Sequence, residues 1–156
     1  MKKNYILLTI SSILILLFLY ASFSKIFEIS QFKRDMFNQP FPHWLSNIFL
    51  YLIPGTEIAI CVLLILDRFR TKGLVAAAIL MGLFTLYTGA ILFHLFKYIP
   101  CSCGGVIKLL SWRQHLFFNL FFLLISIIAL ILNKQIGISI QDISRAKSGF
   151  KTAASK

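Results

Sequence analysis

Four long apolar runs, separated by short polar segments, decide what this chain can fold into. Residues 5–23 and 73–93 contain no charged side chain, 44–66 contains only Glu57, and 112–132 contains only Arg113 near its edge. About 20 mostly apolar residues suffice for a helix to cross a bilayer. The sequence therefore predicts an all-α integral membrane protein: a four-transmembrane-helix bundle over residues 1–132, then a basic cytoplasmic tail over 133–156.

The first apolar run has a second interpretation, a cleaved signal peptide, since Lys2 and Lys3 precede it. The run is longer than a usual signal-peptide core, and residues 20–23 offer no clean pattern of small residues for cleavage. We therefore expect a retained helix.

The basic residues predict the orientation of the bundle, because Lys and Arg near span ends stay on the cytoplasmic side. With four spans, the N-terminus, the loop 67–72 and the tail share one side. Ten of the sixteen basic residues lie there: Lys2, Lys3, Arg68, Arg70, Lys72, Lys134, Arg145, Lys147, Lys151 and Lys156. We expect cytoplasmic termini in a bacterial inner membrane and a periplasmic loop carrying Cys101 and Cys103.

The net charge of +11 fits this topology and an attraction to anionic lipid headgroups. Nucleic-acid binding would need a soluble basic face, so we expect the bilayer and not a nucleic acid as a partner.

Glu57 lies near the middle of an apolar run. A carboxylate there costs several kcal/mol unless it is paired, protonated or hydrated, so it should face the bundle interior. Lys25 is the available partner if the first helix continues past Phe23. Two interpretations stay open: a proton relay or ligand-facing acid, and a buried ion pair that only holds two helices together.

The last run begins with a helix start signal, because Ser111 and Gln114 form the pattern of a capping box. Trp112, His115 and Asn119 then follow at helical spacing and predict a polar, aromatic face on the side of the bundle that carries the cysteines. An imidazole can give or take a proton near neutral pH, for a thiol or for a bound quinone. The alternative is that His115 and Asn119 only hydrogen-bond between helices.

Cys101 and Cys103 stand one residue apart before the last run, between Pro100 and Gly104-Gly105. A disulfide across this spacing closes a small, strained ring, which favours exchange over structural bracing. A soft cation such as Cu(I) is the alternative, although no second cysteine pair completes a ligand set. Cys61, inside a span, is interpreted as a small apolar side chain.

The sequence also predicts how two segments pack. The segment 24–43 should hold a short amphipathic helix at the outer interface, with Phe32, Met36 and Phe37 toward lipid. In the third run a stripe of small residues should let another helix approach closely: Ala78, Gly82, Thr85 and Gly89.

The order of four motifs resembles the MauE/DoxX-like redox-associated membrane proteins, in particular the methylamine-utilisation MauE type. The motifs are Ser22-Phe23-Ser24-Lys25-Ile26-Phe27, Pro54-Gly55-Thr56-Glu57, Pro100-Cys101-Ser102-Cys103-Gly104, and Trp112 with His115 and Asn119. The resemblance covers about residues 5–132. It implies a membrane bundle that assists disulfide formation or redox maturation of exported proteins, often with a thioredoxin-like partner. Membrane enzymes that couple thiols to quinone look similar but use a two-residue spacer and a second cysteine pair.

Three hypotheses follow. The first is a thiol–disulfide oxidoreductase in which Cys101 or Cys103 exchanges with a periplasmic partner, with His115, Glu57, Lys25, Trp112 and Asn119 as supporting groups and a quinone as a possible cofactor. The second is a small, non-catalytic subunit or assembly factor of a larger membrane complex. The third is a soft-metal carrier.

Overall fold

The computed structural model describes the backbone of residues 2–40, 42–95 and 111–153, and the side chains of residues 3–40, 42–95 and 111–136. Within these ranges the chain forms helices and no strand. They are α1 (Lys2–Phe27), α2 (Ile29–Phe37), α3 (His43–Ile65), the 3₁₀ turn η1 (Asp67–Phe69), α4 (Arg70–Leu92) and α5 (Trp112–Ala153).

Four of these helices have segments long and apolar enough to cross a bilayer: Lys3–Phe27, His43–Ile65, Asp67–Leu92 and Trp112–Ile136. The prediction of an all-α membrane protein with four spans is therefore confirmed. The largest differences from the expected spans are at helix ends, where α1 continues beyond Phe23 to Phe27 and α5 begins at Trp112 but continues far beyond residue 132.

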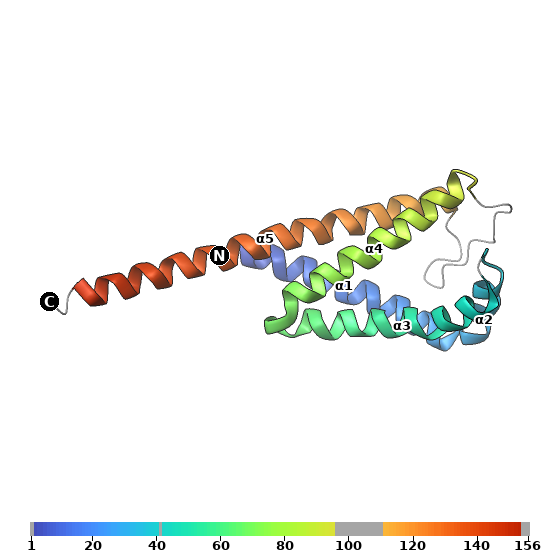
Figure 1. The fold of residues 1–156 in the computed structure, drawn as a ribbon, viewed down its shortest axis with the longest axis horizontal. Helices are drawn as coiled ribbons and strands as arrows, with labels where there is room; N and C mark the ends of the chain where they lie inside the picture. The colour runs from blue at the N-terminus through green and yellow to red at the C-terminus, as the bar shows by residue number, and fades with distance from the viewer. Residues whose placement is uncertain (1, 41, 96–110, 154–156) are drawn as a thin grey trace.

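The bundle is built from two helix pairs, α1 with α3 and α4 with α5, joined by contacts of α3 with α4 and of α1 with α5. Figure 1 shows α2 folded over the end of α3, and α5 continuing past the N-terminal end of α1. The backbone of α5 thus stays helical through most of the segment expected to be a tail. The division of the chain into a membrane domain and a tail remains a prediction.

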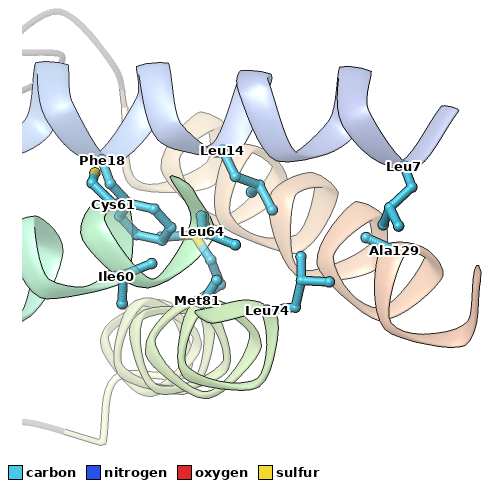
Figure 2. Close-up of a cluster of buried hydrophobic side chains, with 10 residues drawn as sticks. Leu7, Leu14, Phe18, Ile60, Cys61, Leu64, Leu74, Met81 and Ala129 are labelled. Atoms are coloured by element: carbon cyan, nitrogen blue, oxygen red, sulfur yellow. The ribbon is translucent and has the colours of Figure 1, made fainter. Parts of the chain in front are cut away.

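The hydrophobic core lies where α1, α3, α4 and α5 meet. Figure 2 shows Leu14 and Phe18 of α1 pointing toward the other helices, and both side chains are fully buried. Leu64, Leu74 and Ala129 meet them from α3, α4 and α5 and are 0–1% exposed. Many other large apolar side chains on the same helices are exposed, as expected of surfaces that face lipid.

Among the described glycines, Gly73, near the start of α4, lies closest to a neighbouring helix. A Cβ atom added there would lie 2.9 Å from the backbone nitrogen of Leu64 and 3.0 Å from the carbonyl carbon of Leu63. Within the predicted stripe, Gly82 faces Leu123 of α5 at a looser 3.9 Å, and Gly89 has no such neighbour within 4 Å among the described residues. The tightest of these glycine contacts therefore lies outside the stripe.

The expected orientation of α2 is wrong for two of its three residues. Phe32 and Met36 do not face lipid: they are 4% and 8% exposed and pack against Leu50 of α3. The Ser46 hydroxyl also donates a hydrogen bond to the Met36 carbonyl, at 3.2 Å. Because α1 runs directly into α2, the apolar face of α2 closes over the bundle instead of entering the bilayer.

The start of α5 is fixed by the capping box that the sequence predicts. The Ser111 backbone N–H donates to Oε1 of Gln114 at 2.9 Å, and the Gln114 N–H donates back to the Ser111 hydroxyl at 3.4 Å. These two bonds satisfy donors that an uncapped helix leaves open.

Candidate functional site

A buried ion pair joins α1 and α3. Lys25 Nζ lies 2.7 Å from Oε1 of Glu57, and the two residues are 8% and 1% exposed. Lys25 also donates to the Ala21 carbonyl one turn earlier, at 3.2 Å. The pairing that the sequence suggested is present, and for the stated reason: α1 continues past Phe23 and carries Lys25 into the bundle.

The second carboxylate oxygen of Glu57 differs from the first in its hydrogen bonding. Oε2 is buried and has no hydrogen-bond partner among the residues that the structure describes. A buried charged acceptor without a donor is unfavourable, because it has lost water and gained nothing in exchange. Oε1 of Glu57 is thus hydrogen-bonded, and Oε2 is available to a donor.

Glu57 lines a cavity of about 470 Å³ inside the bundle. All five α-helices contribute to its wall, which is mostly apolar and aromatic. Its polar side chains are Lys25, Gln39, Thr56, Glu57, Tyr87, Thr88, His115 and Asn119. This volume falls in the range of small-molecule sites, which typically combine apolar walls with a few convergent polar groups.

His115, Trp112 and Asn119 all face this cavity from α5. Asn119 is 3% exposed, and its amide donates to the Thr88 hydroxyl at 3.2 Å, while Thr88 donates onward to the Phe84 carbonyl at 2.6 Å. Asn119 therefore makes the interhelical bond that was one of its two interpretations. The structure brings these three residues to one cavity with Lys25 and Glu57, and their chemical roles remain predictions.

The sequence did not predict that α2 and Tyr87 of α4 form part of the cavity wall. Tyr87 donates a hydrogen bond from its hydroxyl to Oε1 of Gln39, which joins the end of α2 to α4. Phe32 and Met36 of α2 form the adjoining wall. The signal available was the pair Tyr87-Thr88 inside an otherwise apolar run, since polar groups in spans usually face the bundle interior.

The three cysteines divide into two groups. Cys61 is 2% exposed, lies in the hydrophobic core and donates from Sγ to the Ile15 carbonyl at 3.6 Å, and it is not part of the cavity wall. Cys101 and Cys103 lie outside the described residues. No three His, Cys, Asp or Glu side chains gather as a metal site within the described part of the chain. The soft-metal hypothesis concerned the two loop cysteines and therefore stays untested.

These features define a class: a helical, multi-pass membrane protein with a polar cavity inside its bundle. A comparison with family profiles identifies the family within this class. Residues 3–132 match the family described as methylamine utilisation protein MauE, and the chain belongs to that family. The resemblance drawn from the four motifs is thereby confirmed. Searches of the curated proteins and of the solved structures gave no match.

Proposed function

We propose that this chain is a membrane-embedded thiol–disulfide redox protein that assists disulfide formation or redox maturation of exported proteins. The family's name ties the chain to methylamine utilisation. The observation that carries the redox proposal is the cavity, where Lys25, Glu57 and His115 converge inside an apolar bundle. Such an arrangement suits a membrane-dissolved partner that exchanges protons.

Cys101 and Cys103 are the proposed exchanging thiols. In the oxidising direction, a thiolate of an exported protein attacks the Cys101–Cys103 disulfide and releases one of the two cysteines as a thiolate. A second thiolate of the exported protein then displaces the other cysteine. The exported protein leaves with a disulfide, and this chain keeps two electrons and a reduced cysteine pair.

The cavity residues are the proposed route for protons during reoxidation. A quinone bound in the cavity would accept the two electrons and two protons that the Cys101–Cys103 pair releases as its disulfide reforms. The mostly apolar wall of the cavity fits such a molecule. His115 would pass protons, since its imidazole can both donate and accept, and the Lys25–Glu57 pair would hold charge fixed beside it.

The proposed setting is the bacterial inner membrane, with both termini cytoplasmic and the Cys101/Cys103 loop periplasmic. A thioredoxin-like periplasmic protein is the proposed exchange partner. The excess of basic residues on the opposite loops and termini supports this orientation.

Trapping the thiols with a membrane-impermeant maleimide that adds mass tests the proposal. In a Cys61→Ser chain only Cys101 and Cys103 can react, and their labelling in intact cells should fall with oxidant and rise with reductant. Ser102→Ala, which keeps both thiols, is the matched control. Disulfides of exported proteins should be lost with Cys101→Ser/Cys103→Ser and kept with Ser102→Ala.

The opposite result would favour the second hypothesis. If the oxidation state of the two thiols never responds, and the double Cys→Ser chain still supports maturation, the protein acts as a non-catalytic subunit or assembly factor. Stoichiometric Cu(I) binding that disappears with the same substitutions would instead favour the soft-metal carrier.

A further inference from the structure

We infer that the cavity binds the reduced form of a membrane quinone, a quinol, and that one ring hydroxyl of the quinol donates a hydrogen bond to Oε2 of Glu57. This inference deepens the proposed function, because it rests on a quinone as the electron carrier and assigns the residue that recognises it. It also names the redox form that the site prefers.

Glu57 defines the hydrogen-bonding chemistry of the ligand. Oε2 of Glu57 is buried, lines the cavity and accepts no hydrogen bond within the described part of the chain. Lys25 donates to Oε1 and to the Ala21 carbonyl and makes no hydrogen bond to Oε2. A ligand that brings a hydrogen-bond donor would satisfy Oε2, and a donor to a carboxylate makes one of the stronger hydrogen bonds in proteins.

The route into the cavity runs between α3 and α4. Leu52 of α3 and Leu83 of α4 line the cavity and are also 50% and 57% exposed. The cavity thus reaches the outer surface of the bundle between these two helices. Figure 1 shows α3 and α4 separating with distance from their short connection, where Gly73 lies against Leu64. Since this surface belongs to spanning segments, the ligand enters from the hydrocarbon layer and must be soluble in it.

The side chains of the cavity wall define the shape of the ligand. Seven Phe, Tyr and Trp side chains, drawn from all five α-helices, line the cavity with the polar groups: Phe18, Phe32, Phe49, Phe84, Tyr87, Trp112 and Phe118. Aromatic walls favour a flat ring, which they contact by offset or edge-to-face packing. A quinol meets these requirements, because it is flat and apolar, carries hydroxyl donors and dissolves in a bilayer.

Other membrane molecules fit less well. A phospholipid headgroup would bring a phosphate, which is an acceptor and an anion, toward a carboxylate whose cation is already paired. An oxidised quinone offers only carbonyl acceptors, which Oε2 of Glu57 repels. The site should therefore discriminate between the two redox forms of one molecule.

This preference has a consequence for the proposed electron transfer. If the quinol binds more tightly than the quinone, reduction of the bound quinone becomes more favourable by the same factor. For a two-electron couple, each tenfold preference raises the midpoint potential by about 30 mV. The buried Glu57 would thus make the bound quinone a stronger oxidant of a thiol pair.

The experiment measures binding by calorimetry in lipid nanodiscs that contain no quinone, using the Cys101→Ser/Cys103→Ser chain. Three ligands with the same ring are compared: a short-chain benzoquinol, its benzoquinone and its dimethyl ether, which has no donor. Because a hydrogen bond to a charged group is worth about one to two powers of ten in affinity, the quinol should bind about 10- to 100-fold more tightly than either of the others.

The Glu57→Gln variant should lose most of this preference, because a neutral amide accepts more weakly and can itself donate to the quinone. Glu28→Gln, at an exposed carboxylate that does not line the cavity, should keep it. Equal affinity for the three ligands, tighter binding of the quinone, or no binding at all would overturn the inference. If Glu57→Gln does not fold, the comparison of quinol with dimethyl ether in the unsubstituted cavity decides alone.

The chain used in this experiment lacks Cys101 and Cys103, so its quinol binding is measured independently of the proposed thiol chemistry. A quinol preference can be found even if Cys101 and Cys103 prove inactive in cells, which would refute the thiol function and leave the site. Active thiols with no quinol preference would refute the quinol site and leave the thiol function.

Discussion

The Ser22 hydroxyl of α1 donates a hydrogen bond to the Pro54 carbonyl of α3, at 3.3 Å, about one turn before the Lys25–Glu57 ion pair joins the same two helices. Both contacts are buried, and Ser22 is 1% exposed. Two polar links in succession hold the register of α1 against α3. The register is what places Glu57 at the cavity.

The Ser22→Ala substitution should weaken this pairing modestly. Interhelical hydrogen bonds in membranes contribute about 0.6 kcal/mol on average, and we expect a loss of about that size. Ser12→Ala, at an exposed position of the same helix, is the control and should change stability little. The measurement is reversible unfolding in detergent micelles. A loss of several kcal/mol would mean that Ser22 does more than link the two helices.

The Lys25–Glu57 pair should show strong coupling in a double-mutant cycle. Lys25→Met leaves a buried carboxylate without its cation, and Glu57→Met leaves a buried ammonium, so each single change should cost about 3–5 kcal/mol. The double change Lys25→Met/Glu57→Met removes both charges and should recover most of that loss. Unfolding in the same detergent measures all four chains. Additive losses would show that the two charges do not stabilise each other.

Much of the fold was predictable because its signals are local. The spans follow from the lengths of apolar runs, and the start of α5 follows from the Ser111/Gln114 pattern, which needs only four consecutive residues. The Lys25–Glu57 pair was predictable for a different reason. Few charges lie in or beside the spans, so a buried carboxylate had few partners to choose from.

The inward face of α2 was not predictable by the same means. An amphipathic helix beside a bilayer can bury its apolar side in lipid or in protein, and the pattern of Phe32 and Met36 is the same in both cases. The choice is made by contacts with α3 and by the bond between Gln39 and Tyr87, which are 48 positions apart. Such a pairing leaves no periodic signal in the sequence.

The capping box should be measurable at the start of α5. Ser111→Ala removes the side-chain acceptor of the Gln114 N–H, and loss of such a cap typically costs about 1 kcal/mol. Hydrogen exchange of the backbone amides in the first turn of α5 should become faster by about fivefold. Ser30→Ala, at an exposed position in α2, should leave these amides unchanged. Unaltered exchange in Ser111→Ala would show that tertiary packing alone holds the first turn.

Gly73 and Gly89 lie on the same helix and should respond oppositely to the same substitution. At Gly73 an added Cβ meets backbone atoms of Leu64 and Leu63 at 2.9 and 3.0 Å, and backbone cannot rotate away. Gly73→Ala should therefore force α3 and α4 apart and cost about 1–3 kcal/mol. At Gly89 no such atom lies within 4 Å among the described residues, so Gly89→Ala should be neutral or stabilise by up to about 1 kcal/mol through helix propensity. Unfolding in detergent compares the two, and equal effects would show that the α3–α4 approach at Gly73 does not limit stability.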